Sequence, residues 1–427
     1  MNKRVLATIS MASAVLLGTA ACSSSSPSPS GSNSSSSSAG EPAVITFWTN
    51  NSNEVYDNII SDFEKENPNI TVEKTVSQTN QFLQNMQVAA TNKSLPDVFF
   101  EGLGATLAHK FIDNGLVMNL DDHAKAQGWD SQFGKLAIDT LKYKDSWWEA
   151  PHSALGMGLF YSKPVFNQLG LSEPTSFDEL LTDVETIKAA GITPISIGGK
   201  GSWMTMRFTD ALIENFAGPS VHDSLYGANA DWTQPNVLKA LTTLQDWTKK
   251  GYFTPGFLSI DPSTDYVSLF AGKAAMIFEG PWEDSTIAAQ GQNVADYGFF
   301  PFPTDAAPDN PRISAFAQGF MVAQNTKAPD AALKFLDYLT SDAVMAKYAS
   351  TIDGPVANVS VQPPASQPNA RTIKGLLESS QGYLPSDQRF NSTVLNTFFA
   401  SQDSIVAGTK TPEEAAQAIQ QALQNGG

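Results

Sequence analysis

Two tryptophans stand where an indole ring could meet a ligand. Trp282 follows Gly280 and Pro281, a turn after the apolar run "AAMIF", so it is expected at the end of a strand. Trp203 opens a helix after the glycine-rich stretch "GGKGS". An indole offers a flat apolar surface to the C–H face of a pyranose ring, whereas carboxylates and amides bond the hydroxyl rim. Open α/β sheets bind ligands at strand ends, so both positions suggest stacking platforms. The alternative for each is a tryptophan packed on the core.

Polar candidates lie close to these rings. Arg207 follows Trp203 at i,i+4 and could bond hydroxyls or orient a carboxylate, although arginines usually face solvent. Glu279 precedes the Gly-Pro turn, and strand alternation turns either Glu279 or Phe278 toward the core. Glu101 ends a second expected strand, "DVFFE", where it could accept hydrogen bonds from hydroxyls.

Further candidates come from two other segments. Asn51, Ser52, Asn53 and Glu54 open the first expected helix, and one of them is expected to cap it. The stretch "DSWWEAPHSA" holds adjacent tryptophans, of which only one can face a cleft from a strand. We take Trp148 from this pair, together with His152, as binding candidates.

No catalytic set emerges from the sequence, and neither a cofactor nor a metal site is expected. The four histidines, at positions 109, 123, 152 and 222, show no metal-ligand spacing. Neither a G-x-S-x-G elbow nor a phosphate loop is present. Carboxylate pairs are plentiful in so acidic a chain, so a glycosidase pair stays open.

The single cysteine, Cys22, follows an export signal. Residues 1–22 combine a basic start with an apolar stretch too short to cross a bilayer. "GTAAC" resembles the lipobox of bacterial lipoproteins, in which the thiol accepts diacylglycerol, although Thr19 stands where leucine is usual. The alternative is a free thiol in a cleaved or disordered tail. With one cysteine, no intramolecular disulfide can form.

The amino-acid composition indicates a disordered segment near the N-terminus and a strongly acidic chain. Residues 23–40 are almost wholly Ser, Pro, Gly and Asn, and are expected to form a disordered tether spanning roughly 20–25 Å. The net charge of −17 argues against nucleic-acid binding, which needs Lys and Arg to neutralise phosphates. A body of this length usually divides into two domains.

The remaining chain alternates strands and helices. "VITFW" predicts a buried strand, Val55, Ile59 and Phe63 mark one helix face, and "ITVEKTV" predicts a second strand. This β–α–β order is typical of a parallel sheet. Similar alternation continues to the C-terminus, so the fold class is α/β, with a single (β/α)8 barrel as the competing architecture.

Several of these stretches together resemble the extracellular solute-binding lipoproteins of ABC transporters, most closely the carbohydrate-binding group. The resemblance covers nearly the whole mature chain and is carried by the lipobox, "ITFWTNN", "FEKENPNI", "LPDVFFEG", "GLFYSKPVFNQLGL", "LFAGKAAMIFEGPW" and "GFMVAQNTKAPDAALKFLDYLTS".

The resemblance implies a two-lobed periplasmic-binding-protein-like fold with discontinuous lobes joined by a hinge. The implied ranges are 41–152 for lobe 1, 153–313 for lobe 2, 314–352 for the return to lobe 1, and 353–427 for lobe 2 and C-terminal helices that pack on the hinge. The Asn51–Glu54 turn would face the cleft, and the tryptophan of "GPW", Trp282, would stack on sugar.

The implied role is capture of an oligosaccharide by a monomer that is lipid-anchored on the extracellular face of the cell membrane. The closed form would deliver the sugar to a membrane permease, and no bond would be broken. Two alternatives remain. One is a secreted glycoside-cleaving enzyme, and the other is the same fold binding a peptide, a polyamine or a metal chelate.

Overall fold

The structure, a computed structural model, describes residues 42–50, 54–101, 105–227, 229–305, 312–349, 352, 356–379 and 382–426. Cys22, the predicted tether and the candidates Asn51, Ser52 and Asn53 lie outside the described residues.

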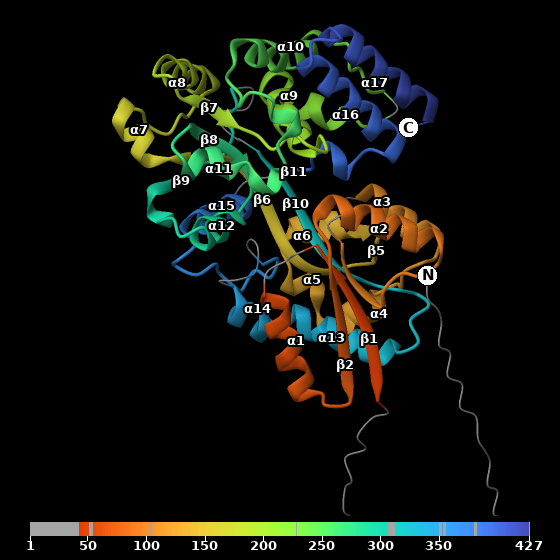
Figure 1. The fold of residues 1–427 in the computed structure, drawn as a ribbon. Coiled ribbons are helices and arrows are strands. Elements are labelled where there is room, and N and C mark those ends of the chain that lie inside the picture. Colours follow the sequence, from red (N-terminus) through yellow and green to blue (C-terminus); the bar gives the residue numbers. More distant parts are fainter. Residues whose placement is uncertain are drawn as a thin grey trace, which may run out of the picture. The chain divides into compact units, whose positions relative to one another are not determined.

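One mixed sheet organises the described chain (Figure 1). Its strand order is β2-β1-β3-β10-β6-β8-β7, with β11 paired to β10 and β9 paired to β6. The strands are β1 Ala43–Thr49, β2 Ile70–Val76, β3 Val98–Glu101, β6 Ala150–Ser162, β7 Thr193–Ser196, β8 Ala274–Glu279, β9 Tyr297–Phe300, β10 Ile313–Val322 and β11 Gly382–Tyr383, and a separate ribbon pairs β4 Lys142–Tyr143 with β5 Ser146–Trp147.

Helices flank the sheet on both sides of its centre. The α-helices are α1 Val55–Glu66, α2 Thr79–Thr91, α3 Ala105–Asp113, α4 Asp121–Gln127, α5 Trp129–Gln132, α6 Lys135–Leu141, α7 Lys163–Leu169, α8 Phe177–Ala189, α9 Trp203–Ser224, α10 Pro235–Lys250, α11 Tyr266–Phe270, α12 Glu283–Ala289, α13 Pro329–Thr340, α14 Asp342–Tyr348, α15 Pro368–Ser379, α16 Ser392–Val406 and α17 Pro412–Gly426, and the 3-10 turns are η1 Phe257–Ser259, η2 Pro262–Thr264, η3 Val294–Asp296 and η4 Ser386–Gln388.

The first β–α–β unit forms as its sequence predicts. β1 pairs in parallel with β2 and β3. Val55, Ile59 and Phe63 of α1 are all buried, because they recur on one helix face. An open sheet with antiparallel β10, β6 and β8 at its centre excludes the (β/α)8 barrel.

Apolar side chains gather at two ends of this sheet. One cluster covers β1–β3 and includes Phe47, Phe63 and Phe335. Another covers β7 and β8 with α8, α9, α10, α16 and α17, and includes Phe208 and Trp247. β6 and β10 contribute to both clusters, so these two strands connect the two halves of the core.

A β-bulge interrupts the long β6–β10 pairing. Gln318 pairs with Ser153 and Gly319 with Pro151, so His152 is the extra residue on β6. A side chain at Gly319 would lie 2.6 Å from the Ala150 carbonyl oxygen, so glycine permits this close approach.

Helices α13 and α14 follow each other closely along the chain and are separated at Ser341. The Ser341 side chain caps α14 by accepting a hydrogen bond from the Val344 amide at 3.4 Å.

Candidate functional site

The start of α9 presents Trp203. The preceding residue, Ser202, adopts a left-handed conformation with φ of 68°. Two residues of α16 hold it there: Ser202 Oγ donates to Asp403 at 2.6 Å, and Gln402 donates to the Ser202 carbonyl at 2.7 Å. The start of α9 is therefore fixed by a distant helix, and Trp203 emerges half-buried beside it.

Arg207 is buried, contrary to the expectation that it faces solvent. Its guanidinium lies 4.1 Å from the Phe316 ring centroid and 5.0 Å from that of Trp203. It also forms a 2.7 Å ion pair with Asp387. Aromatic faces and a carboxylate replace water around the cation, which is what allows an arginine to be only 5% exposed.

The 3-10 turn η4 carries Asp387 and is anchored to α9. Asp210 accepts bonds from both the amide and the hydroxyl of Ser386, each at 2.7 Å. Burial raises the pKa of Asp210 to about 6. This anchor holds Asp387 against Arg207, and the next residue, Gln388, lines a pocket.

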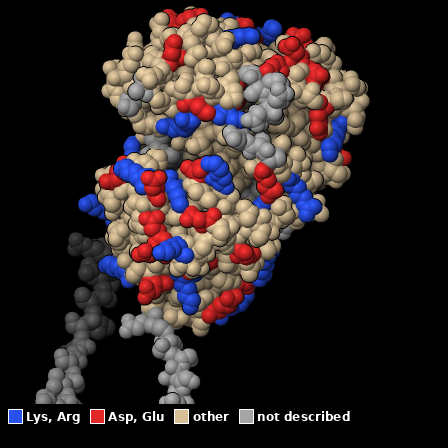
Figure 2. Space-filling view, turned by 180° about the vertical axis from the view of Figure 1, so that it is seen from behind, with Lys and Arg blue, Asp and Glu red and all other residues tan. Residues whose placement is uncertain are grey.

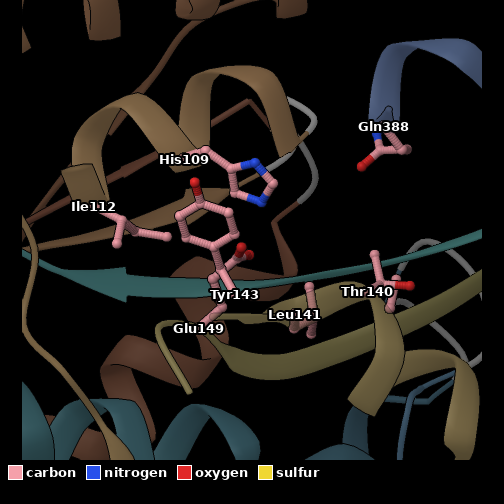
Figure 3. Close-up of a pocket in the computed structure, with 8 residues that line it drawn as sticks. His109, Ile112, Thr140, Leu141, Tyr143, Glu149 and Gln388 are labelled. Atoms are coloured by element: carbon pink, nitrogen blue, oxygen red, sulfur yellow. The ribbon is translucent and has the colours of Figure 1, made fainter. Parts of the chain in front are cut away.

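The walls of a small pocket come from segments far apart in the sequence. The rings of His109 and Tyr143 stack at 3.7 Å with an interplanar angle of 16°. Gln388 faces this pair across the pocket, and Glu149 lies beneath it (Figure 3). The lining residues are His109, Ile112, Thr140, Leu141, Tyr143, Glu149, Ala317 and Gln388.

The pocket's electrostatics favour a neutral aromatic wall beside an ion pair. Burial lowers the pKa of His109. Lys144 lies 4.8 Å over the Tyr143 ring and bonds Asp113 at 2.7 Å, and this bond lowers the pKa of Asp113. An aromatic face together with amide, hydroxyl and carboxylate groups suits a neutral polyhydroxylated ligand.

Trp282 lies at the end of β8, as its sequence predicts. It begins α12 and packs, partly buried, against the same apolar cluster as Trp203. Glu279 is 2% exposed and accepts the Gly280 amide at 3.1 Å. Glu279 therefore faces inward, behind the turn, together with a buried Phe278.

His152 occupies an aromatic cluster and not an open cleft. It is 4% exposed, its Nε2 is 3.1 Å from the Tyr56 hydroxyl, and its ring centroid lies 4.8 Å from that of Phe320. Burial lowers its pKa to about 3, so the ring is neutral at pH 7. The imidazole therefore packs among aromatic rings, and its predicted contact with a ligand stays a prediction.

The other candidates are spread over the first strands. Glu54 is exposed at the start of α1, and Glu101 ends β3 opposite Gly319. Of the adjacent tryptophans, Trp147 packs edge-to-face on Trp129, whereas Trp148 is half-buried and donates its indole N–H to the Tyr143 carbonyl at 3.0 Å. Trp148 thus supports the hairpin that carries Tyr143.

Sequence reasoning missed the pocket residues His109, Tyr143, Glu149 and Gln388. His109 was one of four scattered histidines, and no spacing links it with a residue 279 positions later. The hairpin "KYKDSW" was the available signal, since a tight turn with Lys144 and Asp145 at positive φ projects Tyr143.

The described residues offer neither a metal-binding cluster nor a membrane-spanning helix. Among them, no group of three or more His, Cys, Asp or Glu side chains is placed to hold a metal ion. Their helices also include none that combines the length and apolar character needed to cross a membrane.

The sequence model of the bacterial extracellular solute-binding proteins matches residues 49–346. The "Multiple sugar-binding protein" of Streptococcus mutans is 26% identical over 354 residues, covering 78% of this chain and 79% of its own.

Solved structures share the fold. A protein from a study of xylan utilization by Caldanaerobius polysaccharolyticus superposes with a TM-score of 0.81 at 23% identity, covering 88% of this chain and 99% of its own. A chitin oligosaccharide binding protein superposes with a TM-score of 0.81 at 22% identity, covering 90% of this chain and 99% of its own. These likenesses confirm the predicted α/β fold, whereas the predicted residue limits of the lobes stay predictions.

Proposed function

Because the chain belongs to the bacterial extracellular solute-binding protein family, we infer that it captures an oligosaccharide and delivers it to an ABC transporter permease for import. The observation that carries this inference is the meeting of aromatic faces and hydrogen-bonding groups from α3, the β4–β5 hairpin, α9 and η4. Such a set recognises both the apolar face and the hydroxyl rim of a sugar.

We assign different roles to the candidate residues. Trp203 and Trp282 stack on sugar faces. Further contacts come from residues at or just after the ends of β1, β3 and β5, which are Asn51, Ser52, Asn53, Glu54, Glu101 and Trp148. Arg207 orients Trp203, since its guanidinium lies against that ring. Glu279 and His152 support the ligand surface from behind, a role that their burial favours.

A lipid anchor fits the family's extracellular location. We propose that Cys22 carries diacylglycerol, that residues 23–40 tether the body to the extracellular face of the membrane, and that the protein acts as a monomer.

The test is a thermal-shift screen over mono-, di- and oligosaccharides, with chromatography of the same mixtures. A binding protein is stabilised by its ligand, by about 2.7 kcal/mol at one hundred times the Kd, and returns the sugar intact. Cleaved products would instead support a glycoside-cleaving enzyme. Stabilisation by a peptide, polyamine or metal chelate alone would replace the sugar as the solute.

A further inference from the structure

The turn η4 is held by two neighbouring side chains of α9. Arg207 pairs with Asp387 at 2.7 Å, and Asp210 accepts two bonds from Ser386, each at 2.7 Å. Arg207 and Asp210 stand three positions apart, so they lie on one face of the helix. Two consecutive residues of η4 are therefore bound to α9, and these bonds fix the direction in which the third residue, Gln388, leaves the turn.

Arg207 is itself held by its surroundings. Its guanidinium carbon lies 4.1 Å from the Phe316 ring centroid and 5.0 Å from that of Trp203, and its Nη1 donates to the Met157 sulfur at 2.9 Å. A planar guanidinium packed on rings in this way is already ordered before it forms its ion pair. Because Phe316 lies on β10 and Met157 on β6, Asp387 meets a donor whose place is set by the two long strands of the sheet.

Gln388 brings an amide to a pocket whose other wall is aromatic. Across from it lie the stacked rings of His109 and Tyr143, whose centroids are 3.7 Å apart (Figure 3). Next to His109, Lys110 donates to the hydroxyl of Ser392 at 2.5 Å, so α3 also contacts the start of α16. The helix that carries the aromatic wall is thus joined to the segment that follows η4.

An amide has the hydrogen-bonding groups that a ligand hydroxyl needs. Its carbonyl accepts bonds and its NH2 group donates two, so Gln388 can meet a hydroxyl in either role. A site that bonds a hydroxyl rejects an analogue lacking it, because the polar group of the protein is then left unpaired. An amide at this position can therefore distinguish one pattern of hydroxyls from another without preferring a charged solute.

We propose that Gln388 is a specificity-determining residue that bonds a hydroxyl of the sugar, and that Arg207 is the positioning residue that holds it in place through Asp387. This proposal rests on the proposed function and assigns residues to its polar contacts. Arg207 then supports two parts of the ligand surface, the Trp203 ring and the Gln388 amide.

The first test compares Gln388→Met with wild type. Methionine keeps the length of the side chain and removes the amide. The probes are the oligosaccharide that gives the largest thermal shift in the screen and its monodeoxy analogues. Calorimetry should show about fivefold weaker binding of the parent oligosaccharide by Gln388→Met. One monodeoxy analogue should bind wild type about fivefold more weakly than the parent does, and should bind Gln388→Met as tightly as the parent does.

A double-mutant cycle tests the route through Asp387. Asp387→Asn keeps the shape of the side chain and removes the charge that binds Arg207, and it leaves the contact between Arg207 and Trp203 in place. It should weaken binding of the parent oligosaccharide about threefold. In the Gln388→Met background the same change should have almost no effect, because the amide that it displaces is already absent.

Arg389→Met is the matched control. Arg389 follows Gln388 directly, pairs with Asp223 at 3.4 Å and lies 4.3 Å from the Tyr226 ring centroid. Its loss removes an ion pair beside the same turn and leaves Asp387 in place. Whatever its effect on affinity, that effect should be the same in the wild-type and Gln388→Met backgrounds. Unchanged affinity of Gln388→Met, or equal coupling of Asp387→Asn and Arg389→Met to Gln388→Met, would overturn the proposal.

Hydrogen exchange without any sugar separates this proposal from the proposed function. The Gln388 amide donates to the Pro385 carbonyl at 2.9 Å within the turn. Arg207→Met should speed exchange around η4 about threefold, whereas Arg389→Met should not. If Arg207→Met folds poorly, Asp387→Asn provides the same comparison. A protein that shows this change but binds none of the sugars contradicts the sugar function and retains the positioning role. Sugar binding with unchanged exchange contradicts the positioning role alone.

Discussion

Trp282 is the side chain whose removal tests the sugar contact most directly. We expect Trp282→Ala to weaken sugar binding more than tenfold, which corresponds to about 1.4 kcal/mol, because the stacking face is lost. The fold should persist, since the ring is only partly buried. Calorimetry with the sugar selected by the screen measures the effect.

The matched control is Tyr338→Ala. Tyr338, on α13, is another partly buried aromatic residue, and its ring centroid lies 5.3 Å from that of Phe63 on α1. Its removal should leave the affinity for sugar unchanged. If Trp282→Ala and wild type bind the sugar with equal affinity, Trp282 does not contact the sugar.

His152 gives a prediction for acid stability. Its folded pKa of about 3 lies below its usual 6.5, so the unfolded chain binds more protons between these values. The stability that neutral His152 contributes is present above pH 6.5 and is lost as pH falls toward 3, by up to about 1.4 kcal/mol per pH unit. Urea unfolding of His152→Phe between pH 6.5 and 4.5 should therefore show a shallower decline than wild type.

Phe100→Leu is the control for that measurement. Phe100 lies in the same cluster, with its ring centroid 5.9 Å from that of His152, and carries no titratable group. It should lower stability at every pH and keep the wild-type slope. If the stability of His152→Phe falls with pH as steeply as that of wild type, the His152 imidazole takes up no extra proton when the wild-type protein unfolds.

Arg207 and His152 illustrate what residue types alone could not reveal. Local spacing placed Arg207 beside Trp203 correctly, but the carboxylate that makes its burial possible comes from position 387. The sequence makes His152 a binding candidate, and the bulge at which it lies depends on the pairing of β6 with Gln318 and Gly319 of β10. Both outcomes are set by partners distant in sequence, which periodicity does not encode.

At the scale of elements, α9 contains a break at Gly218. Gly218 has φ of 80° and is followed by Pro219, so the helix bends there. We expect Gly218→Ala to destabilise the protein by about 1–2 kcal/mol, because a side chain is strained at positive φ. Denaturant unfolding measures this change.

Gly375 provides the contrast within α15. A Cβ at Gly375 meets nothing within 4 Å, and its backbone is helical. Gly375→Ala should therefore stabilise the protein by about 0.5–1 kcal/mol. A Gly218→Ala variant as stable as Gly375→Ala would show that the bend tolerates a side chain.

Elements with a strong apolar periodicity lie where the sequence predicts them. The pocket, in contrast, could not be predicted from periodicity. α1 and the strands on each side of it are local patterns, and so is the capping box at Thr411 and Glu414, whose two bonds are 2.8 and 3.2 Å. The pocket needs α3, the β4–β5 hairpin and η4 to meet, and each is short, so nothing in their sequences specifies the meeting.

At the scale of the whole molecule, charge is distributed without a large basic region on the face in view. Figure 2 shows acidic and basic side chains interspersed over this face. With a net charge of −17, such a surface suits a neutral ligand better than a polyanion.

The predicted anchor is tested on the full chain in membranes. We expect Cys22→Ser to move the protein from the detergent phase to the aqueous phase in a partition assay, because the thiol is the only acceptor for diacylglycerol in this sequence. Ser23→Ala, which alters the neighbouring residue and keeps the thiol, is the control. Continued partition of Cys22→Ser into detergent would argue against lipidation.

The two long strands β6 and β10 also determine how the protein denatures. Leu155 and Phe316 belong to one apolar cluster, while Ala150 and Phe320 belong to the other, all on these same two strands. Neither cluster can melt without unpairing backbone that the other requires. Cooperative, single-step loss of structure on heating follows from this shared pair, even though the chain has the length of two ordinary domains.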